Sequence, residues 1–240
     1  MFDDIIRWVQ NSIMQGISFS GRIPRRATIL NTLEKRLHTE ACQPRSVPYQ
    51  LEGGGTENVV LFNFEAMLQS LLRDDRLMQS DNVVLEPAQP HKYQAQYATN
   101  GTLDEIHQGS VVQQSQQQVC KAPNDVFCGL LLYIDGTTLG PFSSSTLEPV
   151  MFSLSIFNRK TRNQSYAWRP LGFVQHPRDA ELGDGETQDA LKGRNVRNYH
   201  RALKIVLANL EATQAAGGVV CDLKVGGYLH KQQVLKIPLI

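Results

Sequence analysis

Hydrophobic residues recur at helical spacing in three segments of the N-terminal part of the chain. The period predicts amphipathic helices over 2–14, 27–38 and 59–74. Their apolar positions are Phe2, Ile5, Ile6, Val9 and Ile13 in the first, Ile29, Leu30, Leu33 and Leu37 in the second, and Phe64, Met67, Leu68, Leu71 and Leu72 in the third. Residues 41–58 contain two prolines and three consecutive glycines, a composition typical of an exposed linker or loop.

Polar residues dominate from 75 to 125, and the hydrophobic pattern there is weak. A short strand is predicted at Val83–Leu85, and the stretch VVQQSQQQVC is compatible with a helix. We expect this part to connect the N-terminal helices to a more strongly patterned C-terminal part.

Three strand patterns follow in close order at 126–135, 148–158 and 164–174. The second alternates large apolar residues with smaller or polar ones, and the short connections favour antiparallel neighbours. A charged, Gly-rich loop is expected over 175–196. A helix after it ends at Gly217 and Gly218, and Gly226-Gly227 predicts a β-hairpin.

These elements divide the chain into three parts: a helical region with its linker (1–58), a helix with a polar connection (59–125), and an α/β part (126–240). Three sequential strands followed by a helix and further β-structure have the order of an RNase H-like domain. The predicted fold class is therefore α/β (α+β), with a partial RNase H-like domain preceded by a helical N-terminal region.

Composition adds mainly exclusions. The 240 residues include 24 basic and 23 acidic side chains, so a surface for a polyanion must come from local clusters. Two such clusters are Arg22, Arg25 and Arg26, and Lys192, Arg194, Arg197 and Arg201. Four widely spaced cysteines argue against a zinc ribbon or a disulfide scaffold. No secretion signal and no apolar run of about 20 residues is visible, which predicts a soluble cytoplasmic protein that is not secreted.

Asp135 is the residue with the clearest chemical potential, because it ends the predicted strand LLLYID. In an RNase H-like domain, carboxylates near adjacent strands hold two divalent ions against a phosphodiester. An aspartate before Gly136 and Thr137 is also a common way to open a turn. Both interpretations stay open on the residues alone.

Several stretches resemble eukaryotic transposon-encoded proteins of the Plavaka-like, KDZ-related group, which are similar to DDE transposases. They are FNFEAMLQSLLRDDRLM, LLLYIDGTTLG, LEPVMFSLSIFNRKTRNQSYAWRPLGFV and NYHRALKIVLANLEATQAAGGVVCDLKVGG. The resemblance covers residues 59–240 and is most specific at 131–174. It implies a nuclear, DNA-binding enzyme of strand cleavage and transfer that uses Mg²⁺ or Mn²⁺.

The resemblance assigns Asp135 as the first metal-binding aspartate, in a motif that usually continues with Lys-Thr. Gly136 stands where the lysine is expected, which puts activity in question. Asp222 is the second carboxylate by strand order, whereas the resemblance places the second aspartate beyond Ile240. We therefore expect a truncated derivative, inactive alone, whose incomplete sheet needs a second copy or a partner. Arg159, Arg162 and Asn163 are the expected contacts to DNA phosphates, alongside the simpler interpretation of a solvated turn.

Two alternatives remain at this point. One is a non-catalytic nucleic-acid-binding or interaction module that keeps part of the scaffold. The other is an unrelated α/β enzyme that uses Asp135 and Asp222 together, which requires the two carboxylates to converge.

Overall fold

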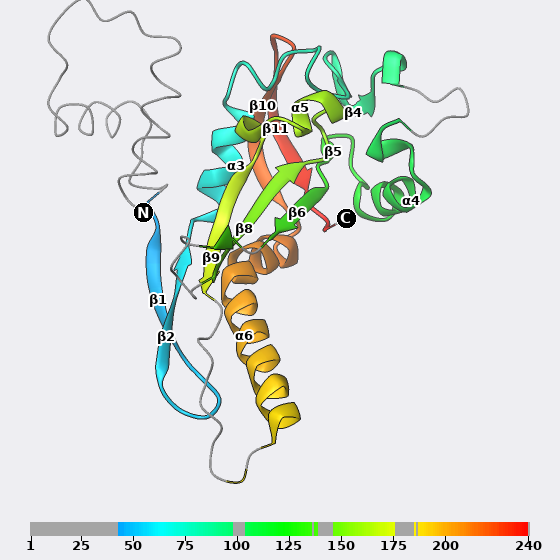
Figure 1. Cartoon of the computed structure of the whole chain (residues 1–240). Helices are drawn as coiled ribbons and strands as arrows, with labels where there is room; N and C mark the ends of the chain where they lie inside the picture. Colours follow the sequence, from blue (N-terminus) through cyan, green and yellow to red (C-terminus); the bar gives the residue numbers. More distant parts are fainter. Residues whose placement is uncertain are drawn as a thin grey trace, which may run out of the picture. The chain divides into compact units, whose positions relative to one another are not determined.

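A computed structural model describes residues 43–97, 104–135, 137–138, 146–175, 185 and 187–239 (Figure 1). The predicted helices at 2–14 and 27–38, and with them the predicted helical N-terminal region, lie outside the described residues. The described part is a mixed α/β structure with four helices.

The helices are α3 (Phe64–Leu72), α4 (Ser110–Val119), α5 (Arg159–Arg162) and α6 (Gln188–Ala215). The strands are β1 (Arg45–Gln50), β2 (Thr56–Leu61), β3 (Leu85–Glu86), β4 (Gln89–Tyr93), β5 (Asp125–Phe127), β6 (Leu130–Ile134), β7 (Thr137–Thr138), β8 (Thr146–Leu154), β9 (Arg169–Gln175), β10 (Val219–Val225) and β11 (Tyr228–Lys236). Three short 3-10 helices are η2 (Ala95–Tyr97), η3 (Ile106–Gln108) and η4 (Ser165–Ala167).

The main sheet has the strand order β1-β2-β9-β8-β6, and β7 pairs with β8. All its pairings are antiparallel; β6 meets β8 with Leu132 opposite Phe152, and β8 meets β9 with Val150 opposite Gly172. The three strands predicted between 126 and 174 are thus antiparallel neighbours, as their short connections indicated. The hydrophobic alternation along β8 puts Val150, Phe152 and Leu154 in the core, which fixes the strand register.

A second sheet, β10-β11-β5, joins the main sheet through one continuous chain segment. Strand β11 runs parallel to β5, with Val234 opposite Asp125. Beyond β5, Cys128 N–H donates to the Lys236 carbonyl at 2.8 Å, and Leu130, the first residue of β6, bridges in parallel to Leu239. The segment 125–134 therefore has β11 beside its first half and β8 beside its second half.

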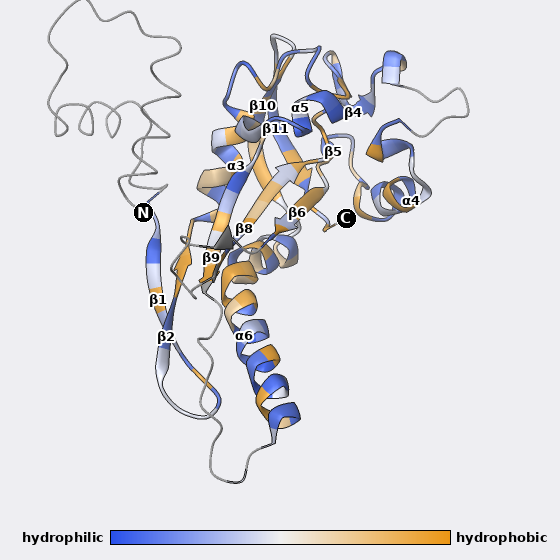
Figure 2. Ribbon diagram, in the orientation of Figure 1, coloured by the Kyte–Doolittle hydropathy of each residue, from blue (hydrophilic) through white to orange (hydrophobic). Residues whose placement is uncertain are grey.

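Helices α3 and α6 cover the same face of the main sheet. The side chain of Asn63 caps α3 by accepting from Ala66 N–H, and the ring of Phe64 contacts that of Phe152 with centroids 5.3 Å apart. Strand residue Gly172 lies on this face too, since a Cβ there would meet both Val206 methyl groups of α6 at 3.1 Å. Figure 2 shows apolar residues concentrated in the half of α6 beside the sheet, whereas its first half is mostly hydrophilic.

The predicted linker at 41–58 is wrong, because this segment contains a β-hairpin. β1 and β2 pair from Arg45–Leu61 to Gln50–Thr56, and the boundary placed at residue 58 falls inside β2. The three glycines form the turn, with φ of 98°, 97° and 90° at Gly53, Gly54 and Gly55. Such positive φ values suit glycine, so the glycine run that resembled a linker encodes a tight reversal.

Other boundaries also differ. Residues 59–61 belong to β2, so the predicted helix at 59–74 begins only at Phe64, and α6 starts at Gln188 inside the predicted loop 175–196. The predicted helix in 111–120 is confirmed by α4, and the hairpin at Gly226-Gly227 by β10 and β11. No helix among the described residues is long and apolar enough to span a membrane.

Candidate functional site

Asp135 directly follows the last residue of β6, the strand at one edge of the main sheet. Its carboxylate is exposed, and Tyr133 Oη donates a hydrogen bond of 2.8 Å to its Oδ2. This hydrogen bond and the nearby negative charge raise the pKa of Tyr133. The Tyr133 ring meets the ring of Trp168 edge-on, with centroids 6.1 Å apart. Asp135 is thus a solvent-facing carboxylate whose orientation is held by a tyrosine.

A carboxylate in this position suits a hard cation such as Mg²⁺, but a metal centre needs further ligands. Among the described residues there is no group of three His, Cys, Asp or Glu side chains that could hold a metal ion. One carboxylate does not align two ions, so the described side chains do not fit the two-metal centre that the resemblance implies. No metal-dependent step can be assigned to them.

Asp222, the second candidate, lies far from Asp135. Its Oδ1 accepts from Gln232 N–H at 3.0 Å, within the β10–β11 hairpin. Gln232 lies two residues before Val234, the residue of β11 that pairs with Asp125 at the start of β5. Asp135 lies at the other end of this segment, after β5 and β6. At about 3.3 Å per residue, the two carboxylates are separated by on the order of 30 Å along the strands. The structure does not bring them together, which removes the enzyme that needs both.

Asp222 instead borders a surface hollow of about 220 Å³ together with Cys221 and Arg73. Burial, with the negative charge of Asp222 beside it, raises the pKa of the Cys221 thiol to about 11. A thiol that stays protonated near neutral pH is a poor nucleophile. The hollow therefore offers no activated cysteine.

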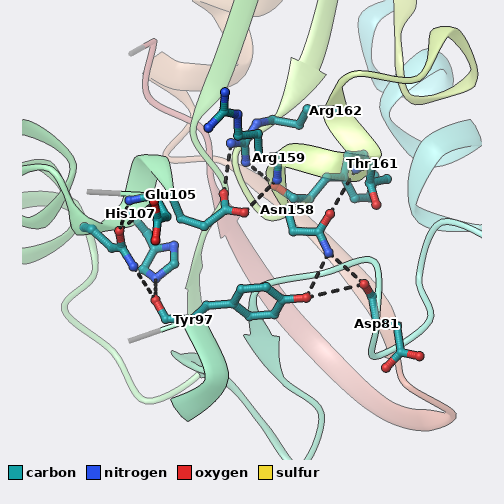
Figure 3. Close-up of polar contacts among 11 residues, drawn as sticks. Asp81, Tyr97, Glu105, His107, Asn158, Arg159, Thr161 and Arg162 are labelled. Atoms are coloured by element: carbon teal, nitrogen blue, oxygen red, sulfur yellow. Dashed lines mark hydrogen bonds and ion pairs between the residues drawn. The ribbon is translucent and has the colours of Figure 1, made fainter. Parts of the chain in front are cut away.

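The three expected DNA-contact residues lie on or beside α5, and one of them is buried. Arg159 and Asn163 are exposed, but only 9% of the Arg162 side chain is accessible. Its guanidinium forms a 2.9 Å ion pair with Glu105, whose side chain is 7% exposed, and also donates to the Phe157 carbonyl (Figure 3). A guanidinium enclosed in this way is not available to a phosphate, so the assignment of Arg162 as a DNA contact is corrected to an internal ion pair.

Asn158 and Glu105 connect α5 to segments far away in the sequence. Asn158 Nδ2 donates to the Asp81 carbonyl at 2.7 Å and to Tyr97 Oη at 2.9 Å, while its Oδ1 caps α5 by accepting from Thr161 N–H (Figure 3). Glu105 Oε1 additionally accepts from Arg159 N–H at 2.7 Å. These contacts hold α5 against the segments around residues 81, 97 and 105, so their role is structural. Asn158 before a helical turn was a readable N-cap signal, whereas nothing in the sequence pairs Glu105 with Arg162.

His107 belongs to the same region and is buried against Tyr93, with ring centroids 4.3 Å apart. Its Nε2 lies 3.2 Å from the Tyr97 carbonyl. Because a carbonyl only accepts, Nε2 carries the proton, and the buried Nδ1 has no hydrogen-bond partner. Burial lowers the pKa of this imidazole. A single histidine in these surroundings is a packing residue.

Comparison of the chain with models of known protein families, with curated proteins and with solved structures gives no significant match.

Proposed function

We propose that this chain is a transposon-derived protein with an RNase H-like, DDE transposase-type domain whose catalysis is lost or strongly reduced, and that its partner is DNA. Nuclear residence follows from the same proposal. It is supported by sequence resemblance at 131–174 and, above all, by the arrangement of the strands around Asp135.

The arrangement of strands is the observation that carries the proposal. The strand ending at Asp135 is followed by two antiparallel neighbours in sequence order, β8 and β9. The long helix α6 then leads to β10 and β11. Strand β11 runs parallel to β5, the strand just before β6, and Leu239 beyond β11 bridges in parallel to Leu130 at the start of β6. This arrangement supports the proposal of an RNase H-like domain, in which β10 would be an additional strand before the parallel one.

Reduced catalysis is proposed because the carboxylates do not converge. Asp135 belongs to no group of three metal-ligating side chains among the described residues, Asp222 is remote, and Gly136 replaces the cation of the family's motif. Metal-dependent phosphodiester cleavage depends on several oxygen ligands that clamp the ions.

A plasmid-nicking assay tests the catalytic part of the proposal. Supercoiled plasmid is incubated with the purified chain in Mg²⁺ or Mn²⁺, and Asp135→Ala is compared with Asp222→Ala as the matched control. We expect no nicking above the Asp135→Ala background. Nicking that disappears in Asp135→Ala but persists in Asp222→Ala would show that catalysis is retained and would overturn the reduced activity.

A second copy or another partner is proposed to cover the free side of β6. Within the described residues, the stretch after Leu130 is hydrogen-bonded only to β8, and Tyr133 and Ile134 are 49% and 38% exposed. An unpaired strand edge with apolar side chains favours strand addition. Sedimentation velocity should show a dimer that dissociates in Ile134→Lys; a monomer at all concentrations contradicts self-association.

A further inference from the structure

The first half of α6, together with Lys204 in the turn that follows, carries a stripe of cations directed at the β1–β2 hairpin. Arg194, Arg197, Arg201 and Lys204 are spaced by three or four residues, which places them on one face of the helix. Contacts confirm where this face points: a Cβ on Gly53 at the hairpin turn would meet the Arg194 guanidinium at 2.6 Å. In Figure 1 the hairpin and α6 lie beside each other, and Figure 2 shows this half of α6 as hydrophilic.

Glu52 fastens the hairpin to α6 and fixes the stripe. Its backbone N–H donates to Oδ1 of the buried Asn198 at 2.7 Å. Its carboxylate accepts a forked pair from Arg197, with Nε–Oε2 at 2.8 Å and Nη2–Oε1 at 2.6 Å. This hydrogen bonding to Arg197 lowers the pKa of Glu52. The attachment holds the two elements at a defined separation.

A groove of about 460 Å³ lies next to this attachment. It is lined by Tyr49 and Gln50 of β1 and by Arg201, Lys204, Ile205 and Ala208 of α6. Apolar groups form most of the lining of the groove, and Arg201 and Lys204 are exposed along α6. Arg201 Nη2 lies 3.7 Å from Glu52 Oε2. Glu57, the other nearby acid, accepts from Tyr49 Oη at 3.3 Å. The cations outnumber these two acids, in a chain whose net charge is only +1.

We propose that this groove binds the phosphate backbone of DNA through Arg201 and Lys204, with Arg194 and Arg197 extending the positive surface. From Arg194 to Lys204 the helix rises about 15 Å, at 1.5 Å per residue. One DNA strand presents a phosphate about every 3.4 Å of duplex axis, and more widely spaced along the winding strand, so the stripe is long enough to meet a few phosphates. The proposal rests on the DNA partner of the proposed function and moves the contact from α5 to α6.

Charge-reversal variants and DNA binding in EDTA test the groove, because cleavage cannot occur without divalent metal. The probe is a short fluorescein-labelled duplex, followed by anisotropy at several salt concentrations. The groove variant is Arg201→Glu/Lys204→Glu. Its control is Arg159→Glu/Lys160→Glu, which reverses two neighbouring cations on α5 that are also exposed. Neutral Arg201→Gln and Lys204→Gln variants accompany them, in case a second acid beside Glu52 loosens the hairpin.

We expect the groove variant to bind about tenfold more weakly or worse, and its salt dependence to be shallower by about two, roughly 0.9 for each lost phosphate contact. Each neutral variant should lose about half of that slope, and the α5 control should bind like the wild type. Wild-type binding that survives the groove changes would overturn this inference and leave the proposed function standing. Failure of the wild type to bind DNA would overturn both.

Discussion

The ion pair between Arg162 and Glu105 leads to the sharpest stability prediction. Replacing Arg162 by Met keeps much of the side-chain volume but leaves the carboxylate of Glu105 buried without its counter-charge, although Arg159 N–H still donates to it. Removing one partner of a buried pair costs about 3–5 kcal/mol, because a charge is then enclosed without a counter-charge. Many domains have only about 5–15 kcal/mol of total stability, so the expected loss is large.

The chain contains a control for this change. Arg76 and Asp74 form an ion pair at the same 2.9 Å, and the Asp74 side chain is 15% exposed, but the Arg76 side chain is 81% exposed, so water can replace the guanidinium. The Arg76→Met variant should therefore cost about 0.2–1 kcal/mol, the range of surface pairs. The two ion pairs have the same N–O distance but differ in burial, so a difference between their losses of stability reports the effect of desolvation and not that of distance.

Urea unfolding of the wild type and the variants, with linear extrapolation to water, measures these differences. A third protein, Arg162→Met/Glu105→Gln, removes the buried charge while the Gln carbonyl still accepts from Arg159 N–H. It should be more stable than Arg162→Met alone by about 1 kcal/mol or more. Equal losses in Arg162→Met and Arg76→Met, or no recovery in the double variant, would refute the reasoning.

Two further predictions use the packing of the sheet and the buried imidazole. Gly172→Ala should destabilise the protein by about 1–3 kcal/mol in the same unfolding assay, because the new Cβ would lie 2.5 Å from the Val60 carbonyl oxygen. The control is Gly55→Ala, whose new Cβ meets no atom within 4 Å and which should cost only the strain of its positive φ. Equal losses of stability in the two variants would contradict the steric argument. Burial lowers the pKa of His107 below its unfolded value of 6.5, so the unfolded state binds more protons than the folded state as the pH falls through that value. The free energy of unfolding should therefore decline from pH 7 toward lower pH, and it should decline less in His107→Gln. An unchanged pH profile in that variant would contradict this role of His107.

Local patterns in the sequence predicted several elements correctly because their physical causes are local. The Gly226-Gly227 turn, the alternating core residues of β8 and the end of α6 before Gly217 and Gly218 follow from backbone freedom and from the periods of strands and helices. The glycine run at 53–55 was misread because three glycines serve a flexible linker and a tight turn equally well. What decided between them was the pairing of β1 with β2 and its docking on α6 through Glu52.

The candidate site shows the same division. The sequence by itself determined that a carboxylate, Asp135, ends a strand of the sheet and that Arg159 and Arg162 lie near the turn between β8 and β9. Only the tertiary structure decided that Asp222 is remote, that Arg162 is enclosed by Glu105, and that the cations of α6 face a groove. Residue spacing determines which side chains share a face of one element. Which faces meet depends on long-range packing and register, and burial then decides whether a charge serves as an internal ion pair or remains available to a ligand.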